Sequence, residues 1–471
     1  MARRSRNPLH VLKFGGTSLG VAERIAWASR HAASSARRRR TLVVVSAMAG
    51  MTNLLLRSAR AAATGDGNWR KAADEIRERH RQAAEALLSG AERKRFDSRM
   101  EEAIATLEKN CENFEASGEA TAQGLDSVAS LGEVISAALF AAALREAGAR
   151  ARAVDAAELI VTDNRFGDAN VMVEATEKRL RERVGPLLSR GVVPVITGFR
   201  GATTEGAPTT LGRGSSDYTA TLTGSLLGAQ EITIWTDVDG VMTADPRLVP
   251  GARVISRLSY GEAIELAFFG AKVIHWKAIL PAMQSQMPLR VRNSFRPRNA
   301  GTRIVSGANC RTAVAAVTAV PRAHLVTLRG DGALRPVELA TRALGWLDGA
   351  GAHPLLVVQS SPENSLAFAL GHEEATLAGF CHPISARQAS DGFVVHSSEE
   401  VGLVTAIGAR IGQPAGAAAR IFTALERCRV NVLAAATGSS GQRLALAVPQ
   451  NSLRAAVRAI HREFRLQRNA R

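Results

Sequence analysis

Apolar runs that alternate with helix-prone stretches fill the first 300 residues of this 471-residue chain. The runs have the length and the Val, Ile and Leu content of strands buried on both faces, and the segments between them are long enough for crossover helices. This alternation predicts an α/β fold with a mainly parallel sheet. The predicted strands are HVLKF (10–14), TLVVVSA (41–47), VVPVITGF (192–199), EITIWTD (231–237) and LRVRNS (289–294).

Two other parts of the chain have patterns of their own. Residues 68–117 are polar with apolar residues at helical spacing, and we expect helices that pack on the sheet. After RNAGTRIV (298–305) two units follow, near 324–397 and 401–466, each with the order strand, helix, strand, strand. This weak internal repeat predicts two small tandem modules that bind a ligand.

The composition argues against several classes of protein. The chain has no run of about 18 uncharged apolar residues, and MARRSRNPLH lacks an apolar targeting core, so we expect a cytoplasmic protein without a membrane segment. The formal net charge is +17, but aromatic residues make up only 4% and no RNA-binding signature is present, so we expect no nucleic-acid partner. Neither a zinc site nor disulfides are predicted from the four widely spaced cysteines, Cys111, Cys310, Cys381 and Cys428.

Lysine is rare in this basic chain. Only seven of the 60 basic residues are lysine, and none follows Lys277. Arginine and lysine are not interchangeable where a compact, rotatable charge is required. Lys13 and Lys272 are therefore candidate functional residues.

The first predicted strand leads into KFGGTS, which begins at Lys13. Glycines allow backbone N–H groups to approach an anion, and lysine adds a positive charge, so this segment is suited to cradle a phosphate. A tight turn after a buried strand explains the same residues equally well. No GxxxxGK[ST] motif is present, so the segment is not a P-loop.

The segment GRGSSD (212–217) joins a predicted strand to an apolar helix. Arg213 in this glycine-rich loop is suited to bidentate capture of a carboxylate or phosphate. Asp217 has a structural alternative as the cap of the helix that follows. The Asp-rich turn WTDVDGVMTADPR (235–247) carries little information by itself.

Two S-x-x-E segments, Ser130 with Glu133 and Ser259 with Glu262, predict capping boxes at helix starts. FGAKVIHWKAILPA (269–282) is predicted to form a helix with Lys272 in its first turn. A cation there opposes the helix dipole, which favours a nearby anionic ligand.

In chain order the motifs together resemble the aspartate kinases of the amino-acid kinase family, over residues 10–305. The units beyond resemble two ACT regulatory domains, and no homoserine dehydrogenase is expected. The resemblance implies a three-layer, carbamate-kinase-like α/β domain (1–305) with a mainly parallel sheet, followed by two ferredoxin-like ACT domains (306–397 and 398–471). The motifs are KFGGTS, VVSAMAGMTNLL, SLGEVIS, TDNRFG, GFRGATTEGAPTTLGRGSSDYTA, IWTDVDGVMTADPR and FGAKVIH.

The resemblance implies transfer of the γ-phosphoryl group of MgATP to the side-chain carboxylate of L-aspartate. Magnesium is expected mainly on the phosphates, with few direct protein ligands. The implied catalytic residues are Lys13 and Asp217. The implied substrate contacts are Ser46, Thr52, Glu133 for the ammonium, Arg213 for the α-carboxylate, Gly214 and Ser216. The implied ATP contacts are Lys13, Gly15, Gly16, Thr236, Asp237, Met242, Arg247 and Lys272.

Several positions depart from the family pattern. Met242 stands where a tyrosine is usual, Ser215 where glycine is usual, and Trp276 where proline is usual. The resemblance also implies a homodimer or larger oligomer through the ACT domains and an amino-acid effector, with Gln359 and Asn431 as candidate contacts. The alternative function is an amino-acid-binding regulatory paralogue with impaired kinase activity.

Overall fold

The computed structural model describes residues 7–271, 273–307, 313–330, 334–371, 393–412 and 416–467. The chain divides into two compact units. The first consists of Met1–Gly240 and Val273–Ser306, and the second of Val241–Lys272 and Gly307–Arg471. The segment 241–272, which the sequence assigns to the kinase domain, thus belongs to the second unit; the predicted boundaries at 305 and 397 stay a prediction.

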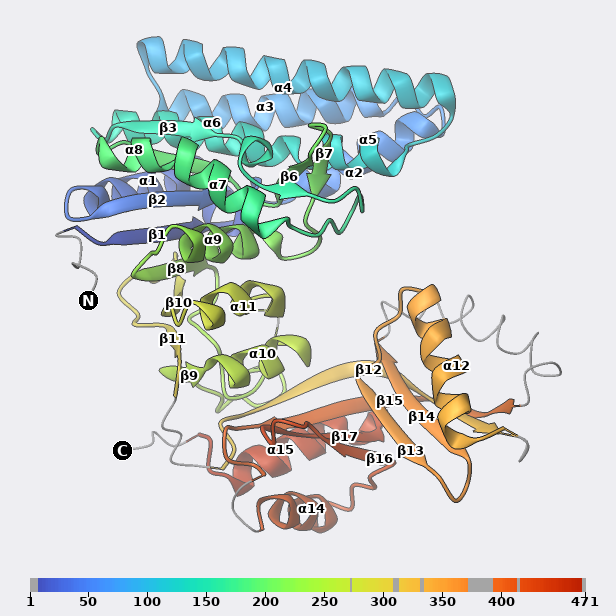
Figure 1. The fold of residues 1–471 in the computed structure, drawn as a ribbon. Coiled ribbons are helices and arrows are strands. Elements are labelled where there is room, and N and C mark those ends of the chain that lie inside the picture. The colour runs from blue at the N-terminus through green and yellow to red at the C-terminus, as the bar shows by residue number, and fades with distance from the viewer. Residues whose placement is uncertain are drawn as a thin grey trace. The chain divides into compact units, whose positions relative to one another are not determined.

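A mainly parallel sheet forms the centre of the first unit (Figure 1). Within this unit, all neighbouring strands of this sheet run parallel except β10 and β11. The five predicted strands are all confirmed. Their apolar side chains are buried between the helices that cover the sheet. In spatial order the strands are β3 (Ala151–Val154), β5 (Val193–Thr197), β2 (Arg40–Val45), β1 (Leu9–Phe14), β8 (Glu231–Thr236), β10 (Leu289–Asn293) and β11 (Thr302–Val305).

Helices cover this sheet. α6 contacts β2, β3 and β5, whereas α9 contacts β1, β2 and β8. The predicted helical stretch 68–117 is confirmed as the antiparallel pair α3 and α4 (Figure 1). The expected packing on the sheet is wrong, because the two helices pack mainly on α2 and α6. The helices are α1 (Ala22–Ala36), α2 (Met51–Ala63), α3 (Trp69–Leu87), α4 (Gly90–Ser117), α5 (Ala122–Ala129), α6 (Leu131–Glu146), α7 (Val173–Arg183), α8 (Gly185–Ser189), α9 (Ser215–Leu226) and α11 (Trp276–Gln284).

A small second sheet lies in the same unit and consists of β4 (Val161–Thr162), β6 (Arg200–Thr203) and β7 (Pro208–Thr210). Two short 3-10 helices, η1 (Gly16–Leu19) and η2 (Ala156–Glu158), follow the ends of β1 and β3. Among the described residues, one stretch, Ala122–Glu146, is long and apolar enough to cross a membrane, and 83% of it is buried inside the protein. It comprises α5 and α6, so its apolar character matches a helix of the core.

The second unit contains a six-stranded antiparallel sheet. Its strands, in spatial order, are β13 (Leu356–Ser360), β14 (Ser365–Gly371), β12 (Ala316–Gly330), β15 (Phe393–Ile407), β17 (Arg443–Pro449) and β16 (Ala434–Thr437). With α12 (Pro336–Gly349) and α14 (Ala417–Arg427), the chain follows the order β, α, β, β twice, which confirms the predicted repeat. Further elements are β9 (Arg257–Ser259), α10 (Tyr260–Phe268), η3 (Gln450–Ser452) and α15 (Leu453–Glu463).

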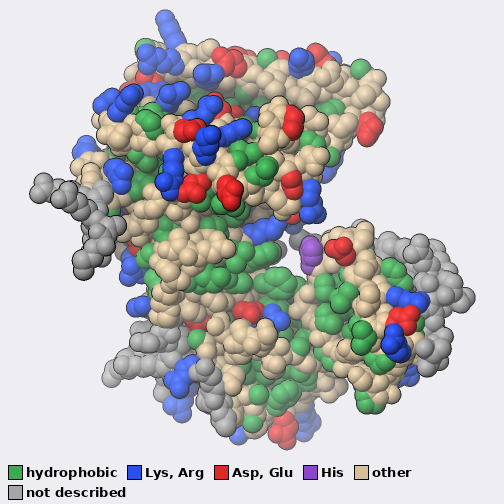
Figure 2. Space-filling view, in the orientation of Figure 1, with side chains coloured by type: hydrophobic (Ala, Val, Ile, Leu, Met, Phe, Trp, Pro, Cys, Tyr) green, Lys and Arg blue, Asp and Glu red, His purple; other side chains and the backbone are tan. Residues whose placement is uncertain are grey.

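The positive charge is mixed with negative charge on the visible surface. Figure 2 shows Lys and Arg side chains interspersed with Asp and Glu over the first unit. Arg77, for example, contacts Asp74, Glu101 and Glu108 at 2.7–3.2 Å. Such pairing reduces the field that a surrounding anion would experience.

One predicted capping box is confirmed and the other is wrong. At the start of α10, Ser259 Oγ accepts from Glu262 N at 3.2 Å, and a carboxylate oxygen of Glu262 accepts from Ser259 N at 2.8 Å. Ser130, by contrast, lies between α5 and α6 in a helical conformation, and its hydroxyl donates to Asp126 O at 2.9 Å. Because α5 leads almost directly into α6, Ser130 cannot act as a free N-cap for Glu133.

The helix predicted to begin just after Gly270 begins later. α10 ends at Phe268 and α11 begins at Trp276, where Nδ1 of His275 accepts from the backbone N of Lys277 at 3.3 Å. The lysine in the first turn of α11 is Lys277, so the predicted position of Lys272 in a first helical turn stays a prediction. Lys272 itself lies outside the described residues.

Glu262→Ala should destabilise the second unit. Glu262 is 0% exposed, and its carboxylate also accepts from Ala409 N at 2.9 Å. Its removal leaves the part-buried N–H groups of Ser259 and Ala409 without an acceptor, at roughly 1–3 kcal/mol each. We expect urea unfolding followed by circular dichroism to show a loss of about 2–5 kcal/mol. The control Glu426→Ala, on an exposed position of α14, should change stability by less than about 0.5 kcal/mol; equal losses would contradict this account.

Candidate active site

The carboxyl ends of the central strands are joined by backbone hydrogen bonds. Ser46 N donates to Phe14 O at 3.1 Å, Gly198 N to Val45 O at 2.8 Å, and Gly15 N to Trp235 O at 3.1 Å. The loops after β1, β2, β5 and β8 therefore meet at one edge of the sheet. Ligands of open α/β sheets bind at this edge.

Lys13 forms a buried ion pair with Asp217. Lys13 lies on β1, between Val44 of β2 and Ile234 of β8, and Asp217 lies in the first turn of α9. Lys13 Nζ and Asp217 Oδ1 are 2.6 Å apart, and the side chains are 9% and 12% exposed. Asp217 therefore orients the ammonium rather than capping the helix, and a lysine ammonium has three donors, so it can also bind an anion.

Of the two glycines after Lys13, Gly16 is the one that close packing requires. The N–H of Gly15 donates to Trp235 O, so it is already occupied in this structure. A Cβ at Gly16 would lie 2.9 Å from Ala47 O, which is closer than side chains tolerate. Ser18 Oγ donates to Ser294 Oγ at 2.8 Å and fixes the turn that follows. Gly16 thus lets the segment approach the end of β2, next to the ammonium of Lys13.

Glu133 is a buried carboxylate near the start of α6. It is 3% exposed, and Oε2 has no hydrogen-bond partner among the described residues. Burial raises the pKa of Glu133 from 4.5 to about 8, against the opposing effects of backbone N–H groups of Ala47 and Glu133 and the charges of Arg200 and Lys13. An unpaired carboxylate oxygen in such a place is suited to bind a cationic ligand group.

The loop before α9 and the first turn of α9 carry three predicted substrate contacts, Arg213 and Gly214 in the loop and Ser216 in the helix. Arg213 is exposed, and Gly214 has a left-handed φ of 71°. A Cβ on Gly214 would also collide with the side chain of His275. Ser216 packs on Gly198, at the end of β5. Ser215, which stands where glycine is usual in the family, is accommodated here. Its side chain is buried, and its Oγ donates to Gly212 O at 2.6 Å.

Four other predicted contacts follow or border the same strand ends. Ser46 directly follows β2 and is half-buried, and Thr52 is the second residue of α2. Thr236 ends β8, and its hydroxyl donates to Asp237 Oδ1 at 3.2 Å. Asp237 is exposed. The structure therefore gathers most of the predicted set in the first unit.

The remaining predicted contacts are not part of that unit. Met242 is half-buried and forms an isolated bridge with Val254, and Arg247 pairs with Asp245 at 2.7 Å in the second unit. Lys272 lies outside the described residues. The candidate effector contacts, Gln359 on β13 and Asn431 after α14, are exposed.

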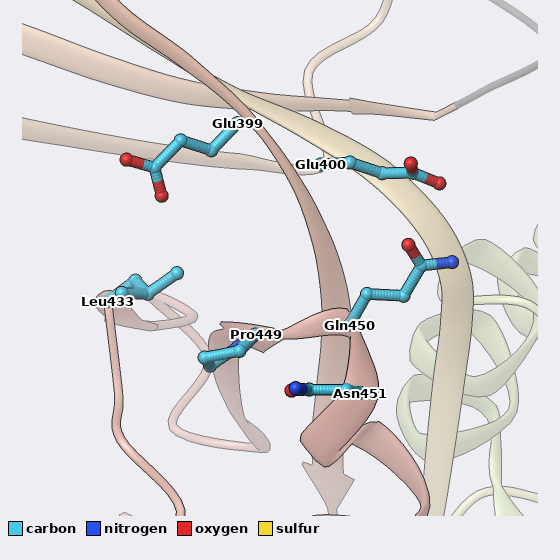
Figure 3. Close-up of a pocket in the computed structure, with 6 residues that line it drawn as sticks. All are labelled: Glu399, Glu400, Leu433, Pro449, Gln450 and Asn451. Carbon is cyan, nitrogen blue, oxygen red and sulfur yellow. The ribbon is translucent and has the colours of Figure 1, made fainter.

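A pocket of about 540 Å³ lies in the second unit (Figure 3). Its two carboxylates come from β15, the polar side chains of Gln450 and Asn451 come from η3, and Pro449 comes from the end of β17 (Figure 3). Gln359 and Asn431 are not among its lining residues, which are Glu399, Glu400, Leu433, Pro449, Gln450 and Asn451.

Sequence reasoning missed two groups of polar residues around the site. Asp126 is buried and accepts from Gly167 N, Thr210 N and Thr210 Oγ1 at 2.7–2.9 Å, which fixes two loops. Arg200 pairs with Asp155 at 3.1 Å. An indication of Arg200 existed in the sequence, because this cation directly follows the predicted strand 192–199. No sequence pattern distinguished Asp126 from the other residues of its helix.

A model of the amino acid kinase family matches residues 8–293, and an ACT domain model matches residues 404–464. The chain is 32% identical to the bifunctional aspartokinase/homoserine dehydrogenase 1 of Zea mays over 97% of its own length but only 50% of that protein, so it spans about half of that relative.

Two further matches cover almost the whole of both proteins. The chain is 32% identical to lysine-sensitive aspartokinase 3 of Escherichia coli, over 96% of this chain and 98% of that one. The crystal structure of E. coli aspartokinase III in complex with aspartate and ADP superposes with a TM-score of 0.81, at 31% identity, and covers 97% of this chain and 99% of that chain.

Glu133→Gln should stabilise the ligand-free protein at high pH only. The raised pKa means that the folded state holds the proton of Glu133 more tightly than the unfolded chain does. Its contribution to stability is therefore present below pH 4.5 and is lost as the pH rises towards about 8. We expect the variant to melt about 2–4 °C above the wild type at pH 9 and at nearly the same temperature at pH 5. A difference independent of pH would contradict the assignment.

Proposed function

The chain belongs to the amino acid kinase family, among its aspartokinases, and we propose that it converts ATP and L-aspartate into ADP and 4-phospho-L-aspartate. The observation that carries the proposal is the buried Lys13–Asp217 pair at the same sheet edge as the buried, unpaired carboxylate of Glu133. These groups offer one site for a phosphoryl group and one for an ammonium. The names of the E. coli relative and of its aspartate and ADP complex support the same substrates.

Lys13 is proposed to stabilise the phosphoryl group during transfer. Phosphoryl transfer has a loose transition state, so the protein contributes mainly by positioning reactants and by neutralising charge on the oxygens. Asp217 holds the ammonium in place at 2.6 Å and leaves other donors of Lys13 for those oxygens. The Gly16 turn gives the phosphate access to the end of β1.

The other charged groups are proposed to orient aspartate. The α-ammonium of the substrate would provide the missing partner for Glu133 Oε2. The exposed guanidinium of Arg213 would bind the α-carboxylate in a bidentate manner, with Gly214, Ser216, Ser46 and Thr52 around the substrate. Two fixed ends leave the side-chain carboxylate directed at the phosphoryl group, which converts binding into correct orientation.

ATP is proposed to bind along the end of β8, at Thr236 and Asp237, with Lys13, Gly15 and Gly16 at its phosphates. Met242, Arg247 and Lys272 stay proposed nucleotide contacts from the second unit. A kinase that uses ATP needs a divalent cation, and we propose Mg²⁺, which would neutralise phosphate charge. Among the described residues no three His, Cys, Asp or Glu side chains gather to hold a metal, a donor set that fits an ion carried by the nucleotide.

The second unit is proposed to be regulatory. The ACT domain match and the lysine-sensitive relative support an amino-acid effector, for which Gln359 and Asn431 stay candidate contacts. We also propose a homodimer or larger oligomer through the ACT domains, a cytoplasmic location and no nucleic-acid partner. Initial rates with and without lysine and threonine, singly and together, would identify the effector.

Purified protein with MgATP and L-aspartate should form an acyl phosphate, which hydroxylamine traps as a coloured hydroxamate. The control omits aspartate, and a known aspartokinase shows that the assay works. Absence of hydroxamate from folded protein would overturn the proposed reaction. If calorimetry then showed amino-acid binding without turnover, the regulatory paralogue would be the better assignment.

Lys13→Arg should reduce kcat by about 10²–10³, the usual effect of losing one transition-state donor. The ammonium is buried, with the Lys13 side chain 9% exposed and Nζ 2.6 Å from Asp217 Oδ1, and guanidinium is larger and planar. Lys109→Arg, at an exposed position of α4, is the matched control and should keep wild-type kcat. Turnover that survives Lys13→Arg nearly unchanged would show that another group stabilises the phosphoryl.

A further inference from the structure

Arg200, the first residue of β6, connects two elements of the site. Its side chain is 12% exposed, Nε lies 3.1 Å from Asp155 Oδ1, and Nη1 donates to Ser130 Oγ at 2.9 Å. Ser130 directly precedes α6, the helix that carries Glu133. The guanidinium therefore fixes the start of that helix.

Asp155 is itself held in place. Its Oδ1 accepts from Ala157 N at 2.9 Å and from Thr197 Oγ1 at 3.4 Å. Thr197 Oγ1 in turn accepts from Ala156 N at 2.7 Å, and Thr197 is the last residue of β5. The Arg200–Asp155 pair is thus anchored to the edge of the central sheet.

Two cations act on Glu133 among the described residues: Arg200 from β6 and Lys13 from β1. Each has its own acid, Asp155 for Arg200 and Asp217 for Lys13. The helices α1, α2, α3 and α4 contact α6 largely through the apolar core. The ion pair of Arg145 in α6 with Glu92 in α4 lies in the last turn of α6, whereas Glu133 lies in the first.

We infer that Arg200 is a positioning residue for the ammonium of aspartate: it fixes the start of α6 and places a positive charge that favours the carboxylate form of Glu133. Because Asp155 offsets the charge of Arg200, the pair favours the carboxylate without excluding a cationic ligand. This inference rests on the proposed function, in which Glu133 binds the ammonium. In this role Arg200 does not need to contact the substrate or the phosphoryl group.

The test is the pH dependence of kcat/KM for aspartate, which reports groups of the free enzyme. The wild type should lose kcat/KM below about pH 8 as Glu133 is protonated. Arg200→Met should move this limb to higher pH and raise KM for aspartate about 3–10-fold at pH 7, with kcat at saturation nearly unchanged. Asp155→Asn should move it to lower pH, because the charge of Arg200 is no longer offset.

Two control variants separate the effect of removing the charge of Arg200 from a general disturbance of the fold. Arg183→Met, which removes an exposed arginine paired with Glu158 at 2.7 Å, should keep the wild-type profile. Arg200→Lys keeps the charge and should restore the limb towards the wild-type pH, even if Arg200→Met does not fold. Superimposable profiles for the wild type and the folded Arg200 variants, or shifts of Arg200→Met and Asp155→Asn in the same direction, would overturn the inference.

A second measurement is independent of turnover. Calorimetric titration of the full chain with aspartate, without ATP, should show the same opposite shifts in the pH dependence of affinity. A wild type that makes no hydroxamate but shows these shifts would refute the proposed reaction and keep the inference. If the wild type turns over and the variants show no shift in the pH dependence of affinity, the proposed reaction is kept and the inference is refuted.

Discussion

The burial of charged side chains at the carboxyl edge of a parallel sheet is the constraint on which the rest of this structure depends. Lys13 and Asp217 offset each other across the boundary between β1 and α9. Glu133 has no equivalent partner for Oε2 within the described chain, so its burial remains unfavourable in the charged form. The site thus holds one ion pair and one carboxylate oxygen without a partner among the described residues, for which we propose a ligand group.

An apolar scaffold makes this arrangement possible. α6 is buried along most of its length, and the core that surrounds it includes side chains of β1, β2, β5, β8 and five other helices. Such packing holds Glu133 in place even though its ionisation disfavours folding, and it keeps water away from the carboxylate. The packing of the whole core therefore offsets the unfavourable free energy of burying the charge of Glu133, as is common at functional sites.

The sequence predicted the scaffold better than the fine structure of the site. Continuous apolar runs identify buried strands because both faces of a covered sheet are dry, and all five were confirmed. The S-x-x-E pattern could not separate Ser259 from Ser130, because the difference is the helix that runs into Ser130. The pairing of Lys13 with Asp217 and the role of Arg200 depend on contacts between residues about 70–200 positions apart, which local patterns do not encode.

The segment Val241–Lys272 leaves one compact unit and returns to it after joining the other. Within the second unit it is held by Glu262 on Ala409 N, by Glu265 on Arg443, and by Thr318 Oγ1 on Phe269 O. A fragment ending at residue 305 would keep this segment but lose those partners. Recombination at that point, in evolution or in the laboratory, would thus expose a surface that has lost its partners. The part of the chain after residue 305 therefore cannot be exchanged as an independent terminal domain.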